Sequence, residues 1–250
     1  MRKHILFLSG GLKIGGVERI LVEYLNNIDQ DKYDITLFLM SDFGEDAILK
    51  HELNNNIDVR YIKSLELVSK KKELRKKKKN IFYKLKYMRI LKKEKKDSYI
   101  NFIKYLEEIS KVDIIIDFDG SFIKYTKYMK DITKLIWIHA SIIELEKHER
   151  INIAEFGDNL NKYDRIVAIC NEMSEELRSL YPLLSDRISV LYNPFDIDRI
   201  VEKSFDRSEL TKNEENLLKE NYLVTVSRIE KIQKDIPTLI KAYKILKENQ

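Results

Sequence analysis

The sequence is almost free of cysteine. Cys170 is the single one among 250 residues, which excludes a disulfide scaffold and a cysteine-based zinc site. Reduced, cytosolic chemistry is the natural expectation for such a chain. Histidine is scarce as well, with four in all. No clustered pattern of His and Asp indicates metal binding, so we predict no metal site.

Long hydrophobic runs are also missing. No apolar run approaches the roughly 18 residues of a membrane span. Residues Met1–His4 lead straight into the short apolar run Ile5–Leu8. This start has neither a signal-peptide core nor a small-residue cleavage site, so we do not expect secretion. The sequence predicts a cytoplasmic protein, and its 44% hydrophobic content is enough for a folded core.

Charge is distributed unevenly along the chain. The formal net charge is +5, from 46 basic and 41 acidic residues. Between Lys70 and Lys96 there are 15 basic and 2 acidic residues, a local charge of +13. The other residues then carry 31 basic and 39 acidic side chains, a net charge of −8. The chain is therefore an acidic protein with one strongly basic insert, residues 69–96.

The basic insert also carries regularly spaced apolar residues. Ile81, Leu85, Met88 and Leu91 recur at helical spacing among the cations, which predicts a basic amphipathic helix. Such helices can lie on anionic membrane surfaces. A peripheral position on the inner face of the plasma membrane is one interpretation, and a solvated insert without a partner is the other. The pattern favours both over nucleic acid, and we expect no nucleic-acid partner.

Short apolar runs alternate with stretches of helical periodicity. We expect strands at residues 5–9, 33–40, 57–62, 112–118, 134–138, 164–169 and 187–192. We expect helices at residues 17–28, 45–53, 74–95, 98–110, 121–130, 142–160 and 171–180. This alternation predicts an α/β fold with right-handed crossovers and a parallel, Rossmann-like sheet covered on both faces.

A candidate domain boundary follows at Asn193-Pro194. Beyond it we expect a polar helix at 205–219, a strand at 222–226 and a helix at 236–246. We therefore predict one domain at residues 1–192 and the opening of a second α/β domain at residues 193–250. A single βα unit cannot bury its own faces, so the sequence predicts that the rest of the second domain belongs to a longer protein.

Four of the seven glycines lie together, at positions 10, 11, 15 and 16. They join the first strand to the first helix, where a close backbone approach and free helix N–H groups favour an anion. The loop is not a Walker A motif, because no Lys-Ser/Thr follows, and it does not match Gly-x-Gly-x-x-Gly. A tight turn without a ligand is the alternative interpretation.

Three further residues are candidates for a site. His139 follows the strand at 134–138, and functional residues of open α/β sheets gather at the carboxyl ends of strands. Arg228 and Lys234 flank the loop before the last helix. An Arg fork and a Lys point charge at such a loop suit a diphosphate. The alternatives are a surface histidine and a solvated, lysine-rich loop.

Four motifs together resemble the retaining glycosyltransferases of family 4, which have the GT-B fold. They are Gly15-Gly-Val-Glu-Arg19, Trp137-Ile-His139, Val190-Leu-Tyr-Asn-Pro-Phe-Asp196, and Val226-Ser-Arg-Ile229 with its continuation Gln233-Lys-Asp235 and Leu239–Tyr243. The resemblance spans essentially the whole chain. Ser227 departs from it, because the family usually has Gly before the Arg.

The resemblance implies an EC 2.4 hexosyltransferase that moves sugar from a nucleotide-sugar donor. It implies a UDP- or GDP-sugar, no other cofactor, and a glycan or lipid-linked acceptor in cell-surface polysaccharide synthesis. Gly15 and Gly16 would approach the donor phosphates or sugar. His139 would contact the sugar or orient reacting groups, and Arg228 and Lys234 would hold the leaving diphosphate.

The family's acidic pair would lie about 60–80 residues beyond Gln250, judged from typical βα unit lengths. We therefore expect the 250-residue chain alone to be inactive. A non-catalytic module that binds an anionic surface or a partner is the alternative. A GT-B-shaped sugar-nucleotide epimerase is a third option, but the first domain has no convincing set of catalytic acids for it.

Overall fold

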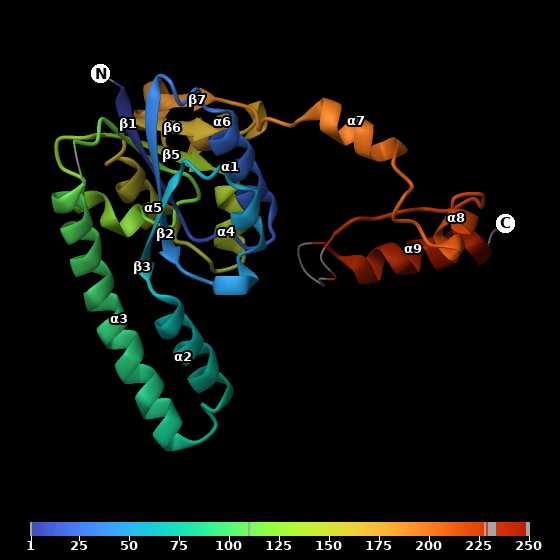
Figure 1. The fold of residues 1–250 in the computed structure, drawn as a ribbon, viewed down its shortest axis with the longest axis horizontal. Coiled ribbons are helices and arrows are strands. Elements are labelled where there is room, and N and C mark those ends of the chain that lie inside the picture. The colour runs from blue at the N-terminus through green and yellow to red at the C-terminus, as the bar shows by residue number, and fades with distance from the viewer. Residues whose placement is uncertain (1, 110, 228, 230–233, 249–250) are drawn as a thin grey trace. The chain divides into compact units, whose positions relative to one another are not determined.

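The structure is a computed structural model that describes residues 2–109, 111–227, 229 and 234–248 (Figure 1). The chain divides into two compact units, Met1–Asp196 and Ile197–Gln250. Each unit is described by itself below.

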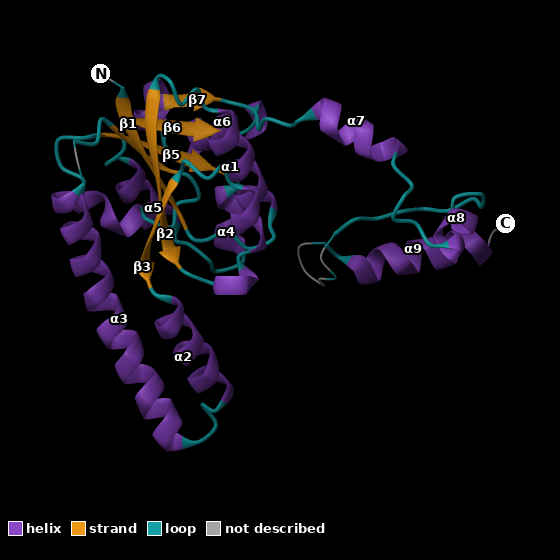
Figure 2. Cartoon of the chain, viewed as in Figure 1, coloured by secondary structure: helices purple, strands orange, loops and turns teal. Residues whose placement is uncertain are grey.

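The first unit is built on one parallel sheet with helices on both faces (Figure 2). The strands are β1 (Lys3–Ser9), β2 (Tyr33–Ser41), β3 (Asp58–Lys63), β4 (Ile114–Asp117), β5 (Thr133–Ile138), β6 (Arg165–Ala168) and β7 (Ile188–Val190). Their order is β3-β2-β1-β4-β5-β6-β7, and every neighbouring pair is parallel. The predicted α/β fold with a parallel, Rossmann-like sheet is thus confirmed.

The two faces of the sheet bury alternate residues of the same strands. Phe7 of β1 packs in a cluster with Leu21 and Leu25 of helix α1 (Gly16–Asn27). Its neighbours in β1, Leu6 and Leu8, point to the opposite face. This is the period of two that a strand imposes on its side chains. The apolar β1 run is therefore buried on both sides.

Two helices that follow β3 form a hairpin. They are α2 (Leu65–Lys76) and α3 (Ile81–Glu108). The C-terminal part of α3 covers the sheet through Phe102, which lies 5.9 Å from the ring of Phe38 and 5.6 Å from that of Phe122. Shorter helices complete the layers: α4 (Ile142–Lys147), α5 (Ile153–Leu160) and α6 (Asn171–Leu180).

Several predicted helix boundaries were wrong. Residues 45–53 and 121–130 contain short 3₁₀ turns, Gly44–Asp46, Ile48–Glu52 and Ile123–Tyr128, in place of α-helices. The helix predicted at 142–160 is two helices, because Glu149 between them has a φ of 54° that no α-helix accommodates. The break in the insert lies at residues 77–80 instead of 96–97. There the Asn80 side chain accepts a hydrogen bond from Phe82 N at 2.9 Å and caps α3.

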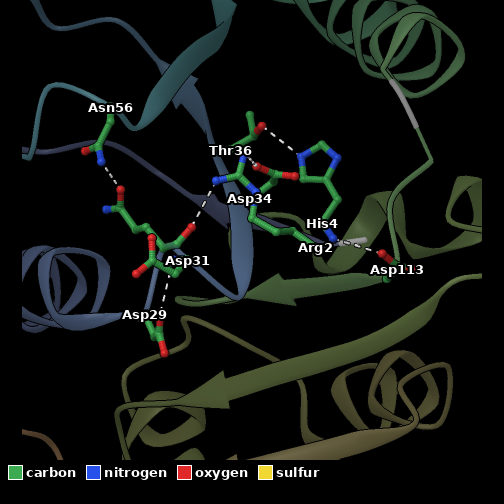
Figure 3. Close-up of polar contacts among 9 residues, drawn as sticks. Arg2, His4, Asp29, Asp31, Asp34, Thr36, Asn56 and Asp113 are labelled. Carbon is green, nitrogen blue, oxygen red and sulfur yellow. Dashed lines mark hydrogen bonds and ion pairs between the residues drawn. The ribbon is translucent and has the colours of Figure 1, made fainter.

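Polar contacts fix the amino ends of the strands (Figure 3). The buried His4 ring lies 3.0 Å from Thr36 Oγ1, and the backbone N–H of His4 donates to Asp113 at 2.8 Å. Arg2 forms an ion pair with Asp34 at 2.7 Å. These contacts lie at the end of the sheet opposite the glycine loop, so they hold strands together there and do not belong to the candidate site.

The described residues of the second unit form three helices: α7 (Ile197–Phe205), α8 (Lys212–Leu217) and α9 (Ile236–Glu248). The helix predicted at 205–219 is shorter and begins where Thr211 and Glu214 form a capping box. Residues 222–226 are not a strand, since a strand needs a neighbour for its ladder of hydrogen bonds and the described part of this unit supplies none. Among its described residues, no side chain is buried.

A buried carboxylate joins the helical hairpin to the sheet. Glu94 of α3 is 6% exposed and forms ion pairs with Lys63 at the end of β3, at 2.9 Å, and with Lys71 of α2, at 2.6 Å. Burial opposes the ionisation of Glu94, but the hydrogen bonds from Lys71 and Lys63 outweigh it and hold its pKa below the ordinary value. One side chain therefore ties three elements together.

We expect Glu94→Gln to destabilise the protein by about 1–3 kcal/mol at pH 7, because it leaves two partly buried ammonium groups without their carboxylate. The lowered pKa means that this stabilisation is present above the ordinary pKa of Glu and is lost as the pH falls through the folded-state value. Urea unfolding at pH 7 and at pH 3–4 measures both effects. Glu66→Gln, an exposed change in the same hairpin, is the control. A difference from wild type that persists unchanged at low pH would contradict the role of the charge.

Candidate functional site

The strand order reverses between β1 and β4. From β1 the chain continues outward to β2 and β3, whereas β4 to β7 extend in the other direction. The chain therefore leaves the carboxyl ends of β1 and β4 toward opposite sides of the sheet, and such a switch point is where open α/β sheets characteristically bind ligands. The residues at this point are Ser9, which ends β1, and Gly10 after it, together with Asp117, which ends β4, and the following residues to Gly120.

Asp119 ties the two loops together. One of its carboxylate oxygens accepts hydrogen bonds from Gly10 N at 2.7 Å and from Ser9 Oγ at 2.8 Å. The other oxygen accepts from Ser121 N at 2.9 Å. These bonds fix the start of the glycine loop and make Asp119 an anchor for it. The sequence analysis missed this residue, although an Asp two positions past a buried apolar strand was the available signal.

A second carboxyl group, Asp117, is completely buried beneath the first. Tyr163 OH donates to one of its oxygens at 2.7 Å, and Phe122 N donates to the other at 3.4 Å. Burial, aided by the nearby charge of Asp119, raises the pKa of Asp117 to about 8. Asp117 is thus protonated at neutral pH, links β4 to the segment before β6, and has no surface for a ligand.

The four glycines of the loop have different surroundings. A Cβ on Gly10 would stand 2.9 Å from Ser121 Oγ, and one on Gly11 would stand 2.5 Å from a ring carbon of Phe43. These two positions therefore need glycine for packing. A Cβ on Gly16 would meet nothing within 4 Å. The approach to the backbone at Gly16 is open.

Gly15 and Gly16 begin helix α1. Gly15 is the N-cap, with an extended backbone and no side-chain cap, and Gly16 is the first helical residue. The N–H groups of a first helical turn lack intrahelical partners and carry the positive end of the helix dipole. The carboxylate of Glu18 folds against Gly15, where it would meet an added Cβ. A negative group thus already lies against this helix end.

His139 lies at the same edge of the sheet, directly after β5. Its ring packs against Phe118, with 4.8 Å between ring centroids. Burial lowers the pKa of His139, and a hydrogen bond with the Phe118 backbone and the charge of Asp119 oppose this only in part. Its Nε2 is buried and has no hydrogen-bond partner among the described residues. A neutral imidazole with one unused nitrogen can donate to or accept from a ligand hydroxyl.

The structure brings Gly15, Gly16 and His139 to one edge of the sheet, but the two predicted cations belong to the second unit. Lys234 is exposed and lies just before α9. Arg228 lies outside the described residues. The diphosphate-binding role of both residues stays a prediction.

No group of three His, Cys, Asp or Glu side chains in the described ranges is arranged to hold a metal ion. No helix of the described chain is long and apolar enough to cross a membrane.

Comparison with known proteins identifies related molecules. The family model described as Glycosyltransferase Family 4 matches residues 14–199, which is more than half of the chain. No curated protein matched the sequence.

Solved structures of Anabaena Alr3699/HepE are similar in fold. The complex with UDP and glucose aligns with a TM-score of 0.52 and 15% identity, covering 79% of this chain and 46% of that one. The complex with UDP-glucose aligns with a TM-score of 0.50 and 15% identity, covering 78% and 45%. The chain thus spans less than half the length of these proteins, and the likeness establishes the Rossmann-like fold that GT-B proteins share.

The raised pKa of Asp117 predicts how stability changes with pH. A carboxyl group with a raised folded-state pKa contributes stability that is fully present below its unfolded pKa, about 3.9, and is lost as the pH rises toward 8. We expect this contribution of Asp117 to decline between about pH 4 and 8, so the stability of Asp117→Asn should fall less, or rise more, over that interval than the stability of the wild-type protein. Denaturant unfolding across the range measures both slopes. Asp186→Asn, at an exposed position, should keep the wild-type slope, and an equal slope in Asp117→Asn would overturn the assignment.

Proposed function

The chain belongs to glycosyltransferase family 4, and from this premise we propose that it is the acceptor-side part of an enzyme that transfers sugar from a nucleotide-sugar donor. The observation that carries the proposal is the family match over residues 14–199. The HepE structures contain UDP, glucose or UDP-glucose, which supports a UDP-sugar as donor, with a GDP-sugar as the alternative.

In the proposed reaction the bond between the sugar C1 and the diphosphate oxygen breaks, and the diphosphate leaves with the electron pair. The acceptor hydroxyl forms the new bond to C1 and loses its proton, with retention of configuration at C1. Negative charge develops on the leaving diphosphate, so fixed donors and cations around it lower the barrier. This part of the proposal needs no metal ion.

The chain's own residues fit the donor side of this chemistry. The open backbone at Gly16 and the N-cap at Gly15 would face the donor phosphates or sugar. The unused Nε2 of His139 would bind a sugar hydroxyl. Arg228 and Lys234 would hold the leaving diphosphate. An acidic pair and the nucleotide pocket would come from a part of the enzyme outside these 250 residues, since the chain spans less than half the length of the HepE structures.

The acceptor in this proposal is a glycan or a lipid-linked glycan of a cell-surface polysaccharide. The protein would act in the cytoplasm, peripherally on the inner face of the plasma membrane, with the basic insert Lys70–Lys96 as its contact with anionic lipid. The exposed basic hairpin also favours a second function, a non-catalytic module that binds an anionic surface. Transfer activity distinguishes the two.

We expect the full-length protein to transfer sugar and the 250-residue chain to show no turnover, because the chain spans less than half the length of the HepE structures and the described residues among 197–250 bury no side chain. Purified proteins are incubated with labelled UDP- and GDP-sugars and a lipid extract, and labelled product is measured. The configuration at C1 of the product, read by NMR, tests retention. Turnover by the 250-residue chain would refute the proposal that the nucleotide pocket lies outside this chain. No turnover by the full-length protein would favour the non-catalytic binding module.

In the full-length protein, Arg228→Ala and Lys234→Ala should each reduce transition-state stabilisation by about 2–4 kcal/mol, the usual result of losing one preorganised charge contact. Steady-state kinetics measures kcat/KM, and circular dichroism checks the fold. Lys241→Ala, on an exposed position of α9, removes the same charge and should leave the kinetics unchanged. Wild-type kinetics in the Arg228→Ala and Lys234→Ala variants would contradict the diphosphate-binding role and favour the alternative, a solvated loop.

A further inference from the structure

The helical hairpin α2–α3 extends from the carboxyl edge of the sheet. Helix α2 begins two residues after the end of β3 at Lys63, so the hairpin leaves from the edge that holds the glycine loop and His139. Its distal end, residues 77–80, lies away from the sheet (Figure 1). Helix α3 has 28 residues, about 42 Å at 1.5 Å per residue, and only its C-terminal part covers the sheet.

The two faces of α3 differ in exposure. Glu94 and Ser98 are buried toward α2 and the sheet. On the outward face Ile81, Leu85 and Met88 are 60%, 54% and 56% exposed. Their i, i+4, i+7 spacing places them in one row along the helix. We call these three residues the outer apolar row.

Cations surround the outer apolar row. Arg89 and Lys92 are exposed beside it and line a shallow hollow with Leu85, Met88 and Leu91. The turn at the distal end adds an unbroken run of lysines at 76–79. The two acids of the insert are engaged within the hairpin and at its base, Glu73 with Lys77 and Glu94 with Lys63 and Lys71. The outward face therefore carries a concentrated positive charge.

The hairpin is also held in a fixed direction. Glu94 bridges β3, α2 and α3 through buried ion pairs, and Leu74 of α2 is buried. The outer apolar row is thus exposed by a clamped element, and rotation of α3 to bury it would break these contacts. A fixed row of exposed apolar side chains is a surface on which a partner with an apolar interior can dock.

We propose that the outer apolar row and its surrounding cations dock the protein on an anionic lipid bilayer. The apolar side chains enter the boundary between headgroups and acyl chains, while the cations contact anionic headgroups. This combination fits a bilayer better than a nucleic acid, whose phosphates reward the charge but not a row of exposed aliphatic groups.

The assignment rests on the proposed function only for the location of the acceptor. Lipid binding itself requires no glycosyl transfer and is tested without it. A chain that binds vesicles while its full-length form transfers no sugar keeps the docking surface and removes the proposed enzyme. An active enzyme that does not bind vesicles keeps the proposed function and removes the docking surface.

The test is flotation of the purified chain with vesicles of neutral phosphatidylcholine or with 30% anionic phosphatidylglycerol. We expect at least tenfold stronger binding to the anionic vesicles, and release as salt shortens the roughly 10 Å screening length. Changing Lys76, Lys77, Lys78 and Lys79 to Gln should weaken binding at least tenfold, since each surface lysine contributes about fivefold. The matched control changes four exposed lysines outside the insert, Lys104, Lys111, Lys124 and Lys130, and removes the same charge.

The apolar part of the surface has its own variant pair. Leu85→Ser with Met88→Ser should weaken binding to anionic vesicles severalfold without changing the melting temperature, because both side chains are exposed. Ile100→Ser, on the same helix and 51% exposed, lies away from the distal cations and should bind as wild type. The proposal is overturned by equal, negligible binding to both vesicle types. It is also overturned if the two four-lysine variants lose vesicle binding equally. A third contrary outcome is that a DNA duplex displaces the protein from anionic vesicles while the variant with Leu85→Ser and Met88→Ser binds those vesicles as strongly as wild type.

Discussion

The reversal of strand order between β1 and β4 is the constraint on which the rest of the first unit depends. Parallel strands place all their carboxyl ends on one edge, and the reversal makes two adjacent loops diverge there. The glycine loop is brought to Asp117, Asp119 and His139 from a segment more than 100 residues before them in the chain. The glycine loop would not meet these three residues if β4 had added beyond β3. The site is therefore a consequence of topology before it is a matter of individual side chains.

Asp117 and Asp119 lie two residues apart and yet have opposite electrostatic environments. Asp119 accepts hydrogen bonds from two backbone N–H groups and one hydroxyl, which satisfy its charge and fix the loop. Asp117 is completely buried beside the charge of Asp119, and these two effects favour its neutral form although the Tyr163 hydroxyl donates a hydrogen bond to it. The strand ends between the two residues, so Asp117 is its last member and lies in the core, whereas Asp119 lies in the loop that follows. One carboxyl group is structural in the core, and the other orders the start of the glycine loop.

The buried carboxylate of Glu94 both stabilises the hairpin and fixes its orientation on the sheet. A carboxylate at 6% exposure would be unfavourable alone, but Lys63 and Lys71 satisfy it from two other elements. The geometry of the pair fixes which face of α3 turns outward. Exposed aliphatic groups and unneutralised lysines on that face are then a consequence of the clamp. The same ion pairs thus connect the sheet edge that holds the candidate site to the surface proposed to meet a membrane.

The sequence by itself determined the parallel α/β fold, because short apolar runs alternating with helical periodicity leave few other architectures. It also located the glycine loop, His139 and the basic insert, which local composition reveals. Tertiary structure decided what depends on neighbours far away in the chain. The break at residues 77–80, the split of α4 from α5 at Glu149 and the short 3₁₀ turns follow from caps, backbone angles and packing that periodicity does not encode. Asp119 as the anchor, Asp117 as a neutral acid and the outward direction of Leu85 each required contacts across the sheet or the hairpin, because burial and hydrogen bonding are properties of the folded chain and not of any one segment.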